Sequence, residues 1–142
     1  MRSHFRSMFV AASVTGFLAA AALPAVAGSV WDGVFASAQV PRGEKIYNEK
    51  CAPCHLPDLS GREPAPELAG DKFMSKWNGH TLEELWVRIS TTMPQGQGGS
   101  LSPEEYRDVV ALLLDANGFP SGAAELSADT NVLKGVTITS QK

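Results

Sequence analysis

Cysteine and histidine are scarce in this sequence, with two cysteines and three histidines among 142 residues. The cysteines allow one disulfide at most, and a bridge between Cys51 and Cys54 would close a very short loop that constrains little. A structural zinc site takes four ligands, so it would have to recruit His55 and His80, which lack the spacing of a paired zinc motif. Disulfide and zinc chemistry are therefore both weak explanations of the cysteine pair.

The apolar run near the N-terminus is too short for a membrane helix. It covers residues 8–22 without a charge, whereas a membrane span needs about 20 apolar residues. A basic stretch at residues 2–6 precedes it and small residues at 25–27 follow it, which is the pattern of a cleaved export signal. We therefore predict a signal peptide over residues 1–27 and a periplasmic mature chain over residues 28–142. Only an uncleaved signal would attach the protein to a membrane.

An excess of positive charge is also absent. The formal net charge is −3, and loss of the signal peptide would remove Arg2 and Arg6 but no acidic residue. This balance argues against nucleic acid and anionic membrane surfaces as partners, and it favours a partner with a basic docking patch. The mature length suits one domain with a modest hydrophobic core.

The most informative feature that is present is the pentapeptide at residues 51–55, Cys-Ala-Pro-Cys-His. C-x-x-C-H is the attachment signal of a c-type haem. Residues three and four apart share one face of a helical turn, so Cys51 and Cys54 can form thioethers to the porphyrin edge while His55 binds the iron. A redox dithiol does not call for the adjacent histidine and normally belongs to a βαβ pattern, which is not seen here. We predict one covalently bound haem c.

A haem iron with one histidine ligand has a second axial position, which either binds another side chain or stays open. The candidates in the mature chain are Met74, Met93 and His80. Met93 follows a predicted helix and precedes Pro94, which stiffens the backbone of a loop able to reach over the haem. We predict Met93 as the second ligand, Met74 as core and His80 as a surface residue. Two strong ligands favour an electron carrier over an open catalytic site.

Start and stop signals predict an all-α chain without a sheet. Thr81 and Ser102 each stand three residues before a glutamate, Glu84 or Glu105, in the capping-box pattern, and Pro103 suits a first helical position. We expect helices over residues 41–51, 72–77, 81–91 and 102–117, an extended lead-in over 28–40, and a C-terminal strap over 119–142 in which 136–138 could form a short strand.

Together these features resemble a class I cytochrome c over about residues 41–118. The resemblance implies an all-α fold of three to five helices around one covalently bound haem. The motifs that carry it are Gly43 and Tyr47 in the first helix, the C-x-x-C-H motif, Pro66-x-Leu68-x-Gly70, Thr92-Met93-Pro94 and the helix from Tyr106 to Asn117.

The resemblance also implies roles for two further residues. Gly43 would let the first and last helices cross closely, and the backbone carbonyl of Pro66 would accept a hydrogen bond from the His55 ring, which orients the ligand. The sequence departs from the family at Leu56, where glycine is common, and at Leu112, where an aromatic residue often meets the glycine crossing.

A finer resemblance is to small cytochromes found with periplasmic quinoprotein alcohol dehydrogenases. Residues 73–79, 102–106 and 117–120 carry it. It implies that a pyrroloquinoline quinone (PQQ)-dependent alcohol dehydrogenase donates the electrons, that Trp77 offers its indole N–H to a haem propionate, and that Arg62 supplies a charge nearby.

These features predict a periplasmic electron-transfer protein rather than an enzyme. It would accept electrons from a periplasmic dehydrogenase and pass them towards a terminal oxidase. One alternative is a cytochrome subunit of a larger dehydrogenase or oxidase complex, which the long tail at residues 121–142 leaves open. Another is a haem enzyme or gas sensor, which would require an open sixth position on the iron.

Overall fold

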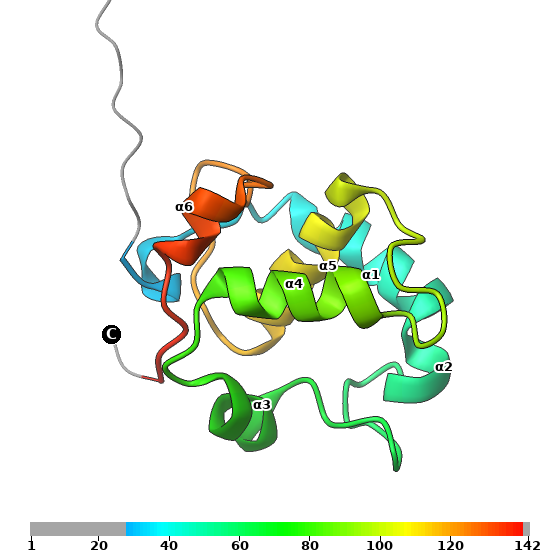
Figure 1. The fold of residues 1–142 in the computed structure, drawn as a ribbon. Coiled ribbons are helices and arrows are strands. Elements are labelled where there is room, and N and C mark those ends of the chain that lie inside the picture. Colours follow the sequence, from blue (N-terminus) through cyan, green and yellow to red (C-terminus); the bar gives the residue numbers. More distant parts are fainter. Residues whose placement is uncertain (1–27, 141–142) are drawn as a thin grey trace, which may run out of the picture.

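The computed structural model describes residues 28–140, so the predicted signal peptide over residues 1–27 lies outside the described residues. Within residues 28–140 the chain is all-α, as predicted, and forms no strand (Figure 1). No helix in this part of the chain has both the length and the hydropathy of a membrane span. The elements are a 3-10 helix, η1 (Val30–Asp32), and the α-helices α1 (Gln39–Lys50), α2 (Ala52–His55), α3 (Gly70–Trp77), α4 (Leu82–Thr92), α5 (Pro103–Ala116) and α6 (Thr130–Lys134).

Both predicted capping boxes are present. The Thr81 hydroxyl accepts from the Glu84 N–H at 3.2 Å, and the Glu84 carboxylate accepts from the Thr81 N–H at 2.7 Å. Ser102 and Glu105 make the same pair of bonds at the start of α5, at 3.2 and 2.7 Å. These bonds satisfy backbone N–H groups that a helix start leaves without partners, which explains why α4 and α5 begin where the sequence predicts.

Helices α1 and α5 cross closely at Gly43. A Cβ atom built on Gly43 would overlap the backbone carbonyl of Asp108 and would lie 3.1 Å from the Cβ of Leu112. Arg42 donates to both carboxylate oxygens of Asp108, at 2.7 and 3.0 Å. The crossing that the resemblance implied is therefore confirmed, and an ion pair between the exposed Arg42 and the buried Asp108 lies beside it.

The lead-in and the tail contribute to the core as well. Val30 and Phe35 are buried ahead of α1, where the sequence predicts only an extended covering segment and no η1. Short helix α6 was not predicted either, because five residues are too few to show a helical period. Because α6 and the four-residue α2 are counted, the described residues form six α-helices, whereas three to five were expected. Buried tail residues are Phe119, Leu126, Leu133, Val136 and Ile138.

The tail is joined to the rest of the domain by a hydrogen bond to a buried glutamine, Gln39. The Gln39 side-chain oxygen accepts from the N–H of Leu126 at 2.7 Å and from the N–H of Ala36 at 3.1 Å, while its amide donates to Asp108 at 3.1 Å. Thr137 forms isolated bridges with Ser29 and Thr81. The segment at 136–138 therefore acts as a strap with bridges and not as a strand of a sheet.

Candidate haem-binding site

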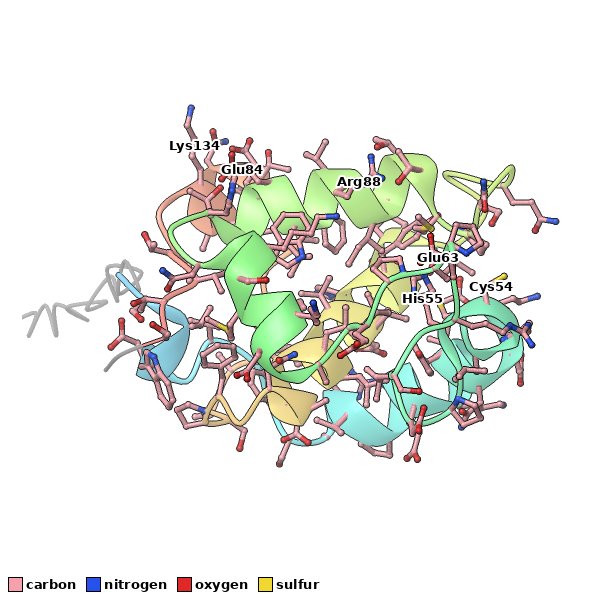
Figure 2. All side chains as sticks on the ribbon, turned by 90° about the horizontal axis from the view of Figure 1, so that it is seen from below. Cys54, His55, Glu63, Glu84, Arg88 and Lys134 are labelled. Atoms are coloured by element: carbon pink, nitrogen blue, oxygen red, sulfur yellow. The ribbon has the colours of Figure 1, made fainter. Side chains whose placement is uncertain are left out.

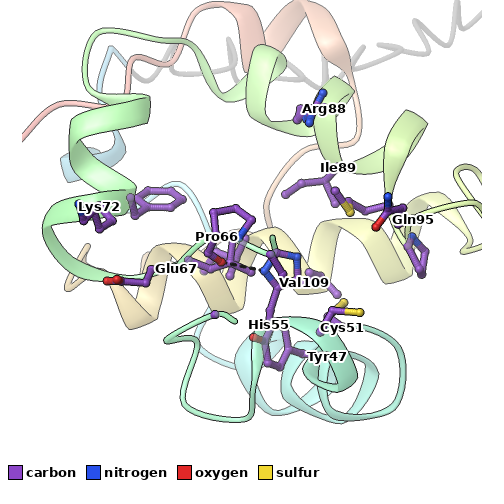
Figure 3. Close-up of a pocket in the computed structure, with 18 of the residues that line it drawn as sticks. Tyr47, Cys51, His55, Pro66, Glu67, Lys72, Arg88, Ile89, Gln95 and Val109 are labelled. Atoms are coloured by element: carbon purple, nitrogen blue, oxygen red, sulfur yellow. Dashed lines mark hydrogen bonds between the residues drawn. The ribbon is translucent and has the colours of Figure 1, made fainter. Parts of the chain in front are cut away.

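A cavity of about 1300 Å³ opens between α2, α3, α4 and α5. Pockets for small ligands usually measure roughly 300–1,000 Å³, so this one can take a large flat group. We call its two sides the His55 wall, which comprises residues 51–68, and the Met93 wall, which comprises residues 88–99. Figure 3 shows Cys51 and His55 on one side of the cavity and Arg88, Ile89 and Gln95 on the other.

His55 ends α2 and is buried, with its ring held by the loop that follows. The Nδ1 atom lies 2.9 Å from the backbone carbonyl of Pro66 (Figure 3). A carbonyl oxygen can only accept, so in the neutral ring Nδ1 carries the proton and Nε2 keeps its lone pair. The bond expected between these two residues is present, and it prepares the other ring nitrogen to bind a metal ion.

Cys51 is the N-cap residue of α2 and Cys54 lies within this helix, and both cysteines line the cavity. Cys51 is partly buried and Cys54 is exposed; Figure 2 shows Cys54 and His55 at the end of the molecule away from Glu84 and Lys134. Burial raises the pKa of the Cys51 thiol to about 11 because desolvation penalises the thiolate. Redox dithiols need a lowered pKa, so this environment does not favour the dithiol alternative.

A zinc site finds no support either. Within residues 28–140 no group of three or more His, Cys, Asp or Glu side chains is placed to hold a metal ion. His80, which such a site would need, is half exposed and pairs with Glu84 at 3.2 Å instead. Its surface position agrees with the prediction.

The two described methionines occupy different environments. Met93 lies at the C-terminal end of α4, where its N–H donates to the Ile89 carbonyl at 2.9 Å, and it lines the cavity. Met74 packs against the apolar core formed by η1, α3, α4, α5 and the tail. Of these two methionines, Met93 is therefore the one that lines the same cavity as His55.

Trp77 and Arg62 also line the cavity. The Trp77 ring packs edge-on against His80 with a centroid separation of 5.7 Å, and the Lys76 ammonium lies 5.6 Å from its centre. Arg62 donates to the carbonyl of Pro53 at 3.0 Å, so this guanidinium lies across the loop beside α2. Both positions are compatible with contacts to the acidic groups of a haem.

The charge around the cavity is opposite in sign to that of the whole chain. Only Glu63 and Glu67 supply negative charge among the described lining residues, against five basic side chains. From the sequence, Arg62 is expected to supply a charge near the haem. Neither Lys50, which adjoins the cysteine motif, nor Arg88, which lies one helical turn before Thr92, is singled out there. The basic lining residues are Lys50, Arg62, Lys72, Lys76 and Arg88.

The lining chemistry fits a covalently attached haem. Two thiols on one turn can bind a ring edge, an imidazole nitrogen and a thioether can bind iron, and an apolar floor can exclude water. The floor residues are Leu68, Phe73, Leu85, Ile89, Val109 and Leu113.

Residues 38–113, more than half of the chain, match the family described as "Cytochrome C oxidase, cbb3-type, subunit III". The chain belongs to this cytochrome c family. Membership implies covalently bound haem c, and the matched residues include Cys51 and Cys54. This cytochrome is therefore a haem c electron-transfer protein of class I.

A curated relative supports the same assignment. The thiosulfate dehydrogenase of Stutzerimonas stutzeri (strain A1501) is 34% identical to this cytochrome over 80 residues, which cover 52% of the chain and 26% of the relative. The match therefore spans about a quarter of the relative's length. No solved structure matches the chain.

Proposed function

We propose that this cytochrome is a periplasmic single-haem electron carrier whose iron is bound by His55 and Met93. The observation that carries the proposal is that one cavity is lined by both residues and by Cys51 and Cys54. In this arrangement Cys51 and Cys54 would hold the porphyrin edge through thioethers. The His55 Nε2 atom and the Met93 sulfur would hold the iron.

When bound, haem c supplies reversible one-electron chemistry at its iron. The chain holds the coordination constant between the two redox states. The Pro66 carbonyl fixes the His55 tautomer and raises its basicity as a ligand. The Met93 thioether and the apolar floor favour the less charged state and raise the reduction potential. Trp77 and Arg62, which line the cavity, would interact with the propionates.

The spectrum of the holoprotein tests the ligands. The ferric protein should show the weak long-wavelength band of methionine-to-iron charge transfer, and Met93→Ala should abolish it while the haem stays attached. Met74→Ala is the matched control and should keep the band. Loss of the band in Met74→Ala alone would reassign the ligand, and CO binding by the wild-type protein would favour a haem enzyme or gas sensor.

The partners follow from the export signal predicted over residues 1–27 and from the chain's resemblances. We propose a periplasmic dehydrogenase as donor, specifically a PQQ-dependent alcohol dehydrogenase, and a terminal oxidase as acceptor. The whole chain is acidic, but the cavity lining is basic. A partner that docks over the cavity should therefore present an acidic patch, which reverses the expectation from composition.

Stopped-flow reduction of the ferric cytochrome by the dehydrogenase tests this role. The rate should exceed that for an unrelated cytochrome c and should fall as salt screens the docking charges. Lys72→Glu should slow the reaction, whereas Lys134→Glu, on α6, should not. Equal rates for the unrelated cytochrome would reject a dedicated acceptor.

A second candidate is a cytochrome subunit of a larger oxidase or dehydrogenase complex. The family description, which names an oxidase subunit, favours it. Gentle purification of the tagged protein distinguishes the two roles. A carrier should elute as a small free protein, whereas a subunit should retain its partners at a fixed stoichiometry.

A further inference from the structure

Tyr106 is a buried tyrosine on α5 whose hydroxyl reaches the Met93 wall. It donates to the backbone carbonyl of Met93 at 2.8 Å and accepts from the N–H of Gly99 at 3.0 Å. Its side chain is buried, and its ring packs edge-on against Trp86 of α4 with a centroid separation of 6.3 Å. The hydroxyl position is therefore fixed by two packed helices.

The segment that this hydroxyl joins is the loop over residues 93–99. At one end the Met93 N–H bonds to Ile89, and at the other the Gly99 N–H also bonds to the Ser90 carbonyl at 2.8 Å. A Cβ atom on Gly98 would overlap the carbonyl of Thr91. The loop is thus folded back tightly on the end of α4.

We infer that Tyr106 is a positioning residue that clamps both ends of this loop and so holds the Met93 sulfur at the iron. The inference rests on the proposed ligation by Met93. A backbone carbonyl that loses a buried partner favours conformations in which it can meet water. Opening of the Met93 wall would move the backbone of Met93 and release its sulfur.

Tyr106→Phe in the holoprotein tests the clamp, because it removes the hydroxyl and keeps the ring against Trp86. Loss of one such hydrogen bond should raise the population with Met93 dissociated about tenfold. The ferric protein should then bind added imidazole about tenfold more tightly, since Met93 competes for the same position. The charge-transfer band should also vanish at a lower imidazole concentration.

Ser102→Ala is the matched control for general loss of stability. Ser102 caps the same helix, and its hydroxyl accepts from the Glu105 N–H at 3.2 Å. Removal of this cap should lower the unfolding midpoint about as much as Tyr106→Phe does, while imidazole affinity stays at the wild-type value. The split between stability and ligand affinity separates positioning from a merely structural role.

Three outcomes decide between the possibilities. Tighter imidazole binding in Tyr106→Phe alone supports the clamp. Equal affinities in Tyr106→Phe, Ser102→Ala and wild type overturn it while leaving the ligation by Met93 in place. Absence of the charge-transfer band from the wild-type protein overturns the ligation itself, and with it the role of Tyr106.

Discussion

The His55 wall is held by bonds between residues that are close in the sequence, whereas the Met93 wall, the end of α4 and the loop after it, is also held by a residue of α5. In the His55 wall the Gly61 N–H bonds to the His55 carbonyl at 2.9 Å, and the Leu68 N–H bonds to the Leu59 carbonyl at 2.8 Å. The Pro66 carbonyl meets the His55 ring in the same stretch. Each of these contacts joins residues fewer than a dozen positions apart.

The Met93 wall depends on a residue that comes later in the chain and from another helix. The hydroxyl of Tyr106, on α5, donates to the backbone carbonyl of Met93 at the end of α4. Both walls accept a hydrogen bond from a tyrosine hydroxyl. In the His55 wall, Tyr47 of α1 donates to the Leu56 carbonyl at 2.8 Å. A tyrosine on each of the two crossing helices thus supports one wall. Residues close in the sequence hold the first wall, whereas the second combines such local bonds with the bond from the more distant Tyr106.

The largest expected effect comes from removing the covalent bonds of the His55 wall. In the double variant Cys51→Ser, Cys54→Ser, both thioethers are lost, so acid–acetone extraction should remove all of the haem. Met93→Ala changes the other wall and should retain all of it. The extracted fraction is read from the absorbance of the two phases, and haem that stayed with the double variant would contradict attachment at this motif.

Gly43→Val should disturb both walls at once, because α1 and α5 carry the two supporting tyrosines. The added side chain would overlap the Asp108 carbonyl, and overpacking of this kind costs about 1–3 kcal/mol. Denaturant unfolding measures the loss. Lys45→Val adds the same side chain at an exposed position of α1 and should leave stability nearly unchanged. Equal stability of the two variants would mean that the helices can separate at Gly43 without cost.

Leu56→Gly should stabilise the His55 wall. Leu56 has φ 62° and ψ 152°, a conformation that favours glycine and costs other residues about 1–3 kcal/mol. Glycine loses more chain entropy on folding, by about 0.5–1 kcal/mol, so we expect a net gain of about 1 kcal/mol. Leu56→Ala is the control, because it removes the side chain and keeps the strain. A glycine variant no more stable than the alanine variant would show that the backbone is not strained.

The smallest expected effect is a pH dependence at the start of α4, which leads to the Met93 wall. The backbone hydrogen bond from Thr81, and then the hydrogen bond from His80, hold the pKa of Glu84 below its ordinary value. Glu84 therefore stabilises the fold above its unfolded-state pKa of about 4.3. This contribution disappears as the pH falls through the folded-state pKa.

Thermal unfolding from pH 7 to pH 2 measures this effect. Glu84→Gln should lower the midpoint at neutral pH and should show a shallower acid decline than the wild-type protein. Glu83→Gln, at the neighbouring first-turn carboxylate, should keep the wild-type decline because the capping box uses Glu84. An unchanged acid decline in Glu84→Gln would contradict the cause given for the shift.

The sequence predicts best those features that residues close in the sequence create. The C-x-x-C-H turn and the capping boxes at Thr81 and Ser102 depend on neighbouring residues, so the order of residue types is enough to predict them. The role of Gly43 came from resemblance, and Asp108 as its partner could not be read from spacing. Gln39 gave no signal, because its burial depends on hydrogen bonds to Leu126 and Asp108, far along the chain.

The missed features are those that packing creates. Helix α6 and the buried tail lack a helical period, and their apolar residues become core only when the tail folds back. The basic lining at Lys50 and Arg88 reverses the sign expected from composition, because net charge says nothing of where charges lie. Tyr106 could be predicted as an apolar contact of α5, but its hydroxyl bonds require the three-dimensional arrangement.

The bridge between the lead-in and the tail also determines how this domain can be joined to other proteins. The Val30 N–H donates to the Thr137 carbonyl at 3.0 Å, and the Thr137 N–H donates to the Gly28 carbonyl at 3.2 Å, so the blue and red segments of Figure 1 meet. A domain with adjacent ends can be inserted into a surface loop of a host enzyme without pulling that loop apart. It also suits circular permutation, in which a short linker would join residues 140 and 28 and new ends would open elsewhere. The adjacent ends of the described residues would therefore allow this haem c domain to be joined to a larger protein at one site on its surface.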